Sequence, residues 1–112
     1  MPPEIAKLLL DMKRAAERIG RFAAGKNFED YQTDDFLRSA IERQFEIIGE
    51  AMTRLAKAAP DAAARITDFR KISSFRNVLI HGYDAIDDTI TWGVVTNKLS
   101  LLKTELDQLL AD

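Results

Sequence analysis

Apolar residues recur every three or four positions along most of this chain, and this spacing constrains its fold more than any other feature. Between residues 4 and 24 the apolar positions form one helical face: Ile5, Leu8, Leu9, Met12, Ala15, Ala16, Ile19, Phe22 and Ala23. A second stripe, running to about residue 58, consists of Leu37, Ala40, Ile41, Phe45, Ile48, Met52 and Leu55. No segment alternates apolar and polar residues with the two-residue period of a strand, so we expect no sheet.

Polar residues and glycine mark where these two helices should begin and end. Gly25 favours a stop after the first helix, because glycine tolerates the left-handed conformation at a helix C-terminus. We expect a loop containing Phe28 and Tyr31 to follow, and then a cap for the second helix within residues 33–35, which read Thr-Asp-Asp. Pro60 should end the second helix and begin a short helical turn that extends through Ile66.

Two more helices are predicted in the second half of the chain. Asp68 is placed to cap a third helix that ends near Gly82 and presents Phe69, Ile72, Leu79 and Tyr83. The last helix should start near Asp87 and Asp88, since acidic side chains are stabilising at a helix N-terminus. Its apolar positions follow the steps of a coiled coil: Trp92, Val95, Leu99, Leu102, Leu106 and Leu109. The sequence therefore predicts an all-α fold, a four-helix bundle with a short extra helical turn.

Length and composition limit what such a bundle can be. With 112 residues, 46% of them hydrophobic and 30% charged, the chain is expected to form a single globular domain over residues 1–112. It has no cysteine, which excludes disulfides, zinc–thiolate sites and cysteine nucleophiles. It starts Met1-Pro2-Pro3-Glu4, without a basic and apolar signal segment, and its apolar runs are short. We therefore expect a soluble cytoplasmic protein with no membrane contact.

Charge gives two opposing indications about nucleic acid. The formal net charge is −2, which counts mildly against RNA or DNA binding as the main task. Between residues 65 and 76, however, the single acid Asp68 is outnumbered by four basic residues, Arg65, Arg70, Lys71 and Arg76. This basic segment is a candidate for RNA binding, although a solvated basic helix face explains the charges equally well.

The chain lacks the motifs of the common cofactors and metals. It has no glycine-rich phosphate loop, no paired-glycine dinucleotide motif and no His-Glu-x-x-His zinc pattern. Its single histidine cannot build an all-histidine metal site. The carboxylate pairs Glu42–Glu46 and Glu46–Glu50 are typical of ordinary helix surface. We therefore expect neither a metal nor a cofactor.

One cluster contains the residue types needed for chemistry: Arg76, Asn77, His81 and Tyr83. Histidine is the side chain that most readily exchanges a proton near neutral pH, which makes His81 the default general acid or base. Asn77 precedes it by four residues, on the same helical face, and its amide could orient the imidazole ring. Arg76 offers a planar cation that suits a phosphate, and Tyr83 offers a phenol. A base for an attacking ribose 2′-hydroxyl and a cation for the developing phosphorane charge together suit phosphodiester cleavage.

The spacing within this cluster poses a geometric problem. Arg76 and His81 are five residues apart, which places them roughly 140° apart around a regular helix. Either the helix unwinds at Gly82, or two copies of the motif meet across a twofold axis, as an isologous dimer permits. The second arrangement predicts a composite site at a homodimer interface. Residue types alone favour a simpler explanation, because a lone histidine at a helix end is more often a cap or a surface residue.

The pattern Arg-x4-His-x-Tyr, present here as Arg76, His81 and Tyr83, resembles the signature of the HEPN superfamily and in particular its HepT-like branch. Further segments agree with this resemblance and extend it over nearly the whole chain: Leu9-Leu10-Asp11-Met12, the run Phe45-Glu46-Ile47-Ile48-Gly49-Glu50-Ala51, Asn77, and Ile72 four residues before Arg76. One departure is Phe69, where relatives often carry Trp. Because an aromatic residue is retained, the packing there should be preserved.

The resemblance implies a homodimeric helical bundle that acts as a metal-independent endoribonuclease on RNA or tRNA, the toxin of a toxin–antitoxin system. It implies that His81 is the base and that Arg76 stabilises the phosphate, with Asn77, Tyr83 and Glu50 in supporting roles. The implied partner is a minimal nucleotidyltransferase antitoxin, which in this family transfers AMP onto the motif tyrosine, here Tyr83. Phosphates attached there would occupy the place of the substrate and repel incoming RNA.

Other interpretations stay open at the level of sequence. The chain could be a non-catalytic binding module that partners a nucleotidyltransferase, or a purely structural helical adaptor. Glu50 and Arg43 could line the site or join a dimer contact, and an exposed helix pair is an equal explanation. The acidic residues Asp84, Asp87 and Asp88 are explained by helix capping or by recognition of the antitoxin.

Overall fold

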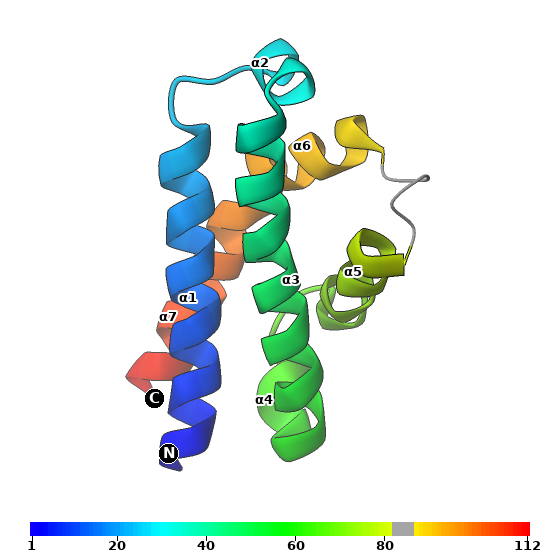
Figure 1. Cartoon of the computed structure of the whole chain (residues 1–112). Coiled ribbons are helices and arrows are strands. Elements are labelled where there is room, and N and C mark those ends of the chain that lie inside the picture. Colours follow the sequence, from blue (N-terminus) through cyan, green and yellow to red (C-terminus); the bar gives the residue numbers. More distant parts are fainter. Residues whose placement is uncertain (82–86) are drawn as a thin grey trace.

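A computed structural model of the chain describes the backbone of residues 1–81 and 87–112 and the side chains of residues 1–75 and 87–112. These residues form seven α-helices and no strand, which confirms the all-α prediction. The helices are α1 (Pro3–Ala23), α2 (Phe28–Thr33), α3 (Asp35–Ala58), α4 (Pro60–Ala64), α5 (Phe69–His81), α6 (Asp88–Asn97) and α7 (Leu99–Ala111) (Figure 1). Among the described helices, none combines the length and the apolar character that crossing a membrane requires.

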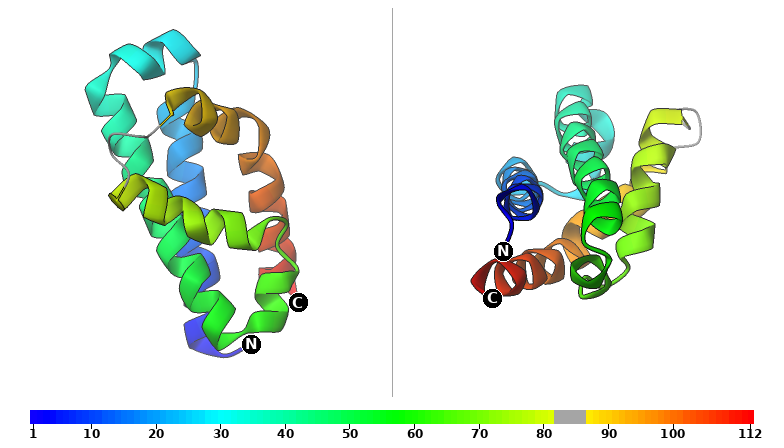
Figure 2. Two further views of the ribbon diagram at one scale, coloured as in Figure 1. Left: turned by 90° about the vertical axis from the view of Figure 1, so that its right-hand side faces the viewer. Right: turned by 90° about the horizontal axis from the view of Figure 1, so that it is seen from below.

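The core lies between the long helices α1 and α3, which run antiparallel, and α7, which packs against α1 (Figures 1 and 2). The apolar stripes predicted for α1 and α3 face one another, so that Leu9, Met12 and Ile41 are completely inaccessible to solvent. Leu106 of α7 is equally buried. Removing such side chains from water stabilises the fold by about 1.5–3 kcal/mol each, which explains why these stripes decide the packing.

α5 lies across α3, on the side away from α1 (Figure 2). The rings of Phe75 and Phe45 meet edge to face with their centroids 5.3 Å apart. The hydroxyl of Ser73 forms a hydrogen bond with that of Thr53 in α3. Phe69 is partly buried against the core, so the aromatic side chain at this position does pack as expected. These contacts attach α5 firmly to the middle of α3.

Residues 28–33 form helix α2, where the sequence analysis predicted a loop. The side chain of Asn27 accepts a hydrogen bond from the backbone N–H of Asp30 at 2.8 Å, and the Asp30 carboxylate accepts one from the N–H of Asn27 at 3.0 Å. This reciprocal capping box satisfies two N–H groups that a helix start leaves without partners. Its residues, Asn and Asp, differ from the usual Ser/Thr and Glu/Gln, so the pattern was overlooked. Tyr31 is thereby turned into the core.

The C-terminal stripe, predicted as one helix, is divided between two. α6 ends at Asn97 and α7 begins at Leu99, and Lys98 between them has a φ of −116° and a ψ of −23°. The four leucines of the stripe that lie in α7 are buried: Leu99, Leu102, Leu106 and Leu109. Trp92 of α6 instead contacts the ring of Tyr31, with 5.2 Å between the centroids. The break lets α6 turn across the end of the bundle towards α2 (Figure 1).

Three predicted helix boundaries are confirmed. Asp34 caps α3 by accepting a hydrogen bond from the N–H of Leu37 at 3.1 Å. Asp87 caps α6 by accepting one from the N–H of Thr89 at 2.8 Å. Gly25 follows α1 with a φ of 72°, in the left-handed region that glycine tolerates.

The predicted cap of α5 differs from the expectation. Asp68 precedes this helix, but its φ of 58° is left-handed, whereas a residue that caps with its side chain has an extended backbone. Its backbone carbonyl accepts a hydrogen bond from the N–H of Ile72 at 3.0 Å. Asp68 therefore starts the helix through its main chain.

Candidate functional site

The motif residues of the sequence analysis lie in, and just after, the C-terminal half of α5. The backbone of α5 is helical through His81, so Arg76, Asn77 and His81 belong to one helix. Within such a helix, five residues of separation correspond to roughly 140° around the axis. The side chains of residues 76–81 lie outside the described part of the structure, as do residues 82–86, which include Tyr83 and Asp84.

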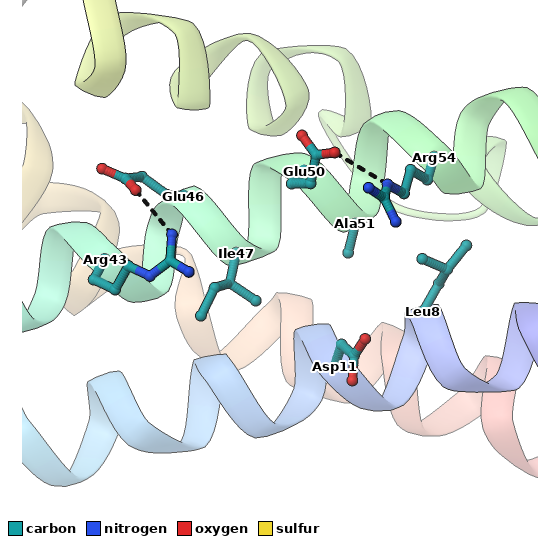
Figure 3. Close-up of a pocket in the computed structure, with 8 residues that line it drawn as sticks. All are labelled: Leu8, Asp11, Arg43, Glu46, Ile47, Glu50, Ala51 and Arg54. Carbon is teal, nitrogen blue, oxygen red and sulfur yellow. Dashed lines mark hydrogen bonds and ion pairs between the residues drawn. The ribbon is translucent and has the colours of Figure 1, made fainter.

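Glu50, the predicted supporting acid, lies on α3 beside a groove between α1 and α3 (Figure 3). Nε of Arg54, one helical turn further on, donates a hydrogen bond to its carboxylate at 3.0 Å. On the preceding turns Arg43 forms a similar ion pair with Glu46 at 3.2 Å. In Figure 3, the carboxylates of Glu46 and Glu50 lie on the side of α3 that faces α5. Glu50 thus lies on α3, the helix against which α5 packs.

The groove beside Glu50 has charges of both signs on an apolar floor. Its volume is about 210 Å³, and its walls include Leu8 and Asp11 of α1 and Ile47 of α3. The side chains of Arg43 and Arg54 are 67% and 69% exposed, so both guanidinium groups can still reach a partner molecule. Among the described residues, no cluster of three carboxylate or imidazole groups could hold a metal ion.

Arg54 was not singled out from the sequence. Its spacing of four residues from Glu50, a favourable arrangement for an ion pair on a helix, is the signal that could have found it. Asp11 lies in the segment Leu9-Leu10-Asp11-Met12 that carried part of the family resemblance, but only the packing of α1 against α3 places it near Glu50.

The three basic residues predicted to bind RNA have different surroundings. Arg65, just after α4, forms an ion pair with the carboxylate of Asp112 at the end of the chain. The guanidinium of Arg70 lies over the ring of Phe69, 4.8 Å from its centroid. Lys71 is exposed on the first turn of α5. Arg70 and Lys71 therefore share the helix that carries Arg76 and His81, whereas Arg65 lies before it and is tied to the C-terminus.

The acidic residues after the motif are partly explained by the structure. Asp87 caps α6, and Asp88 lies in its first turn, where negative charge stabilises a helix.

Burial raises the pKa of Glu42, on α3, above its ordinary value. The nearby charge of Asp88 raises this pKa further, and Arg38 lowers it. Ionised Glu42 therefore destabilises the folded chain.

Glu42→Gln is expected to raise the free energy of unfolding near neutral pH. The pKa of Glu42 is higher in the folded than in the unfolded chain, so its ionisation favours unfolding. This cost is present above the folded pKa and disappears as the pH falls below the unfolded value. The gain should therefore shrink as the pH is lowered to about 4, the ordinary range of a glutamate.

Urea unfolding of Glu42→Gln and of the wild-type chain across this pH range measures the effect. Glu17→Gln, which changes an exposed glutamate of α1, is the matched control. Its free energy of unfolding should stay close to that of the wild-type chain at every pH. An equal gain at acidic and neutral pH would contradict the assignment to Glu42 ionisation.

Comparison with known proteins identifies the family. A family model described as ribonuclease HepT-like matches residues 12–109 of the chain. The chain belongs to the HepT-like family. This confirms the resemblance inferred from the arginine, histidine and tyrosine of the motif.

Two relatives illustrate how far the HepT-like similarity extends. The probable ribonuclease HepT of Thermococcus cleftensis is 32% identical over 104 residues, covering 90% of this chain and 91% of the relative. A Methanocaldococcus jannaschii protein, named as a gamma-glutamylcyclotransferase and a proposed RNase, is 29% identical over 106 residues. The match covers 95% of this HepT-like chain but only 47% of that longer relative, about half its length.

A solved structure shares the HepT-like fold. It is the tri-AMPylated HEPN toxin of Shewanella oneidensis in complex with an MNT antitoxin. The two folds superpose with a TM-score of 0.69 over 100% of both chains, at 16% sequence identity. The HEPN-like architecture predicted from the sequence is therefore confirmed.

Proposed function

We propose that this HepT-like chain is the toxin of a toxin–antitoxin pair and acts as an endoribonuclease that needs no metal ion. The match of the HepT-like ribonuclease family model to residues 12–109 carries the proposal. It is supported by the relative named as a ribonuclease and by a structural neighbour that is a toxin bound to an antitoxin.

The proposed reaction uses the two motif residues of α5. His81 removes the proton of a ribose 2′-hydroxyl, and the freed oxygen attacks the adjacent phosphorus. The bond to the 5′-oxygen of the next nucleotide breaks, which leaves a 2′,3′-cyclic phosphate, and the leaving oxygen takes up a proton from water. Arg76 stabilises the negative charge that develops on the phosphorane, a stabilisation that is often the largest single contribution to catalysis. Asn77, four residues before His81, is proposed to orient the imidazole.

A homodimer is proposed to complete the site. Arg76 and His81 are five residues apart in a continuous helix, so two copies of α5 that meet across a twofold axis can place an arginine of one beside a histidine of the other. The groove at Glu50 suits such an isologous contact, because Arg43 and Arg54 flank the carboxylates of Glu46 and Glu50 there. Each guanidinium can then meet a carboxylate of the second copy.

The antitoxin is proposed to be a minimal nucleotidyltransferase that modifies Tyr83. The phenolic oxygen attacks the α-phosphorus of ATP, pyrophosphate leaves, and AMP stays attached to the tyrosine. Tyr83 follows His81 by two residues, so each added phosphate is proposed to bring negative charge to the motif. It would occupy the place of the substrate phosphate and repel RNA.

Cleavage by the purified, unmodified chain tests the proposed activity. We expect it to cut RNA in the presence of EDTA and to be a dimer by light scattering at micromolar concentration. If unmodified protein cuts no RNA under any condition tried, the enzymatic function should be abandoned in favour of a binding module. If the chain cuts RNA as a strict monomer, the composite site is excluded but the ribonuclease function stands.

Modification has its own measurement. Coexpression with the nucleotidyltransferase should raise the intact mass by whole AMP units and stop cleavage. Tyr83→Phe should abolish the mass increase and leave the chain active in the presence of the nucleotidyltransferase. An unchanged mass despite an active nucleotidyltransferase would count against the proposed neutralisation.

A further inference from the structure

Helix α5, which carries the proposed catalytic pair, is packed closely on one side. Among the described helices, α3 is the one that it contacts extensively. The aromatic pair Phe45–Phe75 and the hydrogen bond between Thr53 and Ser73 both lie near the middle of α5. Contacts at one crossing fix where a helix lies on its neighbour, but its angle needs a second point of support.

Another side of α5 faces an apolar groove. This groove lies between α5, α6 and α7, with α3 behind them, and has a volume of about 320 Å³ (Figure 2, left). Ile72 and Phe75 line it from α5, Ile90 from α6 and Leu101 from α7. Side chains that face one another across an open groove hold a helix less firmly than close packing does. The angle of α5 therefore depends on any direct connection across this side.

Glu105 of α7 supplies such a connection at the edge of the groove. One carboxylate oxygen of Glu105 accepts a hydrogen bond from the backbone N–H of Thr67 at 3.0 Å, and the other accepts one from the Thr67 hydroxyl at 2.9 Å. Thr67 lies two residues before the first residue of α5. Two hydrogen bonds to an ionised group fix the orientation of Thr67 as well as its position.

α7 is a firm anchor for this connection. Leu106, next to Glu105, is completely inaccessible to solvent in the core. Asp107 forms an ion pair with Lys13 of α1 at 2.7 Å. Glu105 therefore ties the start of α5 to α7 and α1, independently of the place where α5 crosses α3.

The turn between Thr67 and α5 depends on such support. Asp68 has a left-handed φ of 58°, which is less stable than right-handed backbone for a residue with a side chain. Its carbonyl accepts a hydrogen bond from the N–H of Ile72 at 3.0 Å, in the first turn of α5. Asp68 thus sets the direction in which α5 leaves the turn. The bonds from Glu105 to the preceding residue help to hold this backbone in place.

A small change of angle at the start of α5 becomes a displacement at its other end. From Ser73 to His81 the helix rises about 12 Å, so a rotation of about 5° at the crossing moves its end by about 1 Å. A misplacement of this size in a catalytic site can lower the rate about a hundredfold. The angle set at Thr67 therefore bears on the geometry of the motif.

We infer that Glu105 is a positioning residue for RNA cleavage: its two hydrogen bonds to Thr67 fix the angle at which α5 crosses α3, and so the place of the motif on the RNA. This inference rests on the proposed function, which assigns cleavage to the motif. Glu105 acts from the opposite end of α5 and need not touch the RNA.

Substitutions on both sides of the contact test the inference. Glu105→Ala removes both hydrogen bonds and should lower kcat at least about tenfold, because a misplaced pair slows the chemistry. KM should stay within about twofold, since the basic residues of α5 are unchanged. Thr67→Val loses only the hydroxyl and should lower kcat less, whereas Thr67→Ser keeps both donors and should retain wild-type kcat. Initial rates over a range of RNA concentrations in EDTA measure these values.

Asp107→Ala is the matched control. It removes the ion pair with Lys13 from the same helix but leaves the start of α5 unchanged, so its kcat should equal that of the wild-type chain. All variants are assayed at a temperature at which circular dichroism shows them to be folded. In the double variant Glu105→Ala, Thr67→Val, kcat should fall no further than in Glu105→Ala alone, as expected when two residues act through one contact.

The outcomes separate this inference from the proposed function. If the wild-type chain cuts RNA and folded Glu105→Ala has the same kcat, the positioning role is wrong although the function stands. If Asp107→Ala loses as much kcat as Glu105→Ala, the loss reflects the general stability of α7 and the positioning role is also wrong. If Glu105→Ala does not fold, Thr67→Val, which changes an exposed side chain, decides in its place, and an unchanged kcat overturns the inference. If the wild-type chain cuts no RNA, both proposals fail.

Discussion

His81→Ala should lower the rate of RNA cleavage by two to four orders of magnitude, because a positioned general acid or base contributes about 10²–10⁴-fold to a reaction. Arg76→Ala should cost about 10²–10³-fold, as the loss of a group that stabilises transition-state charge does. Initial rates on a defined RNA in the presence of EDTA measure both effects.

Arg70→Ala is the matched control for these two variants. Arg70 is an exposed cation on the same helix and lies over Phe69. If Arg70 binds the RNA backbone as proposed, its loss should raise KM and reduce the salt dependence of binding, because a phosphate contact is removed. It should leave kcat at saturating RNA unchanged. If kcat of His81→Ala equals that of the wild-type chain, His81 is not the general base.

A mixture of the two inactive variants decides whether the site is shared between subunits. If each site takes Arg76 from one subunit and His81 from the other, a mixed dimer has one site in which both residues are intact. Random exchange makes about half of the dimers mixed, so about a quarter of wild-type activity should return. If each site uses both residues of one chain, every site in the mixture lacks one group and no activity should return.

Ile41→Ala should lower the free energy of unfolding by about 2–5 kcal/mol, the usual cost of emptying a buried isoleucine site. Ile41 is completely inaccessible between α1 and α3. For a domain of this size, each 1 kcal/mol lowers the melting temperature by about 4–8 °C. A decrease of about 10 °C or more is therefore expected in a thermal melt.

Phe36→Ala is the comparison for this core substitution. It removes a large apolar side chain from the same helix, but Phe36 is 84% exposed, so the change in stability should stay within about 0.5 kcal/mol. Similar losses at both positions would mean that burial between α1 and α3 does not determine the stability of the chain.

Much of the fold could be predicted because local chemistry decides it. The stripes that contain Leu9 and Ile41 identify the buried faces of α1 and α3, since a helix presents every third or fourth residue to one side. Asp34 and Asp87 identify helix starts, because their side chains bind N–H groups a few residues away. Arg76 and His81 were proposed from residue type and order, and they lie within the part of the chain that the HepT-like family model matches.

The errors have two physical origins, one in a contact between distant segments and one in an uncommon local cap. The steps of three and four residues from Trp92 to Leu109 are the same whether the helix continues or breaks, and the contact of Trp92 with Tyr31 accompanies the break at Lys98. Helix α2 was missed because Asn27 and Asp30 form an uncommon version of a capping box.

By itself, the sequence determined where the two long helices α1 and α3 lie and which of their faces are buried, and it predicted which side chains carry the chemistry. Each of these depends on neighbours within a few positions along the chain. Only the tertiary structure decided that Glu50 borders a groove with α1 and that Ile90 and Leu101 share another with α5. A groove is made by residues from several helices, and its shape depends on how those helices cross, which no local pattern specifies.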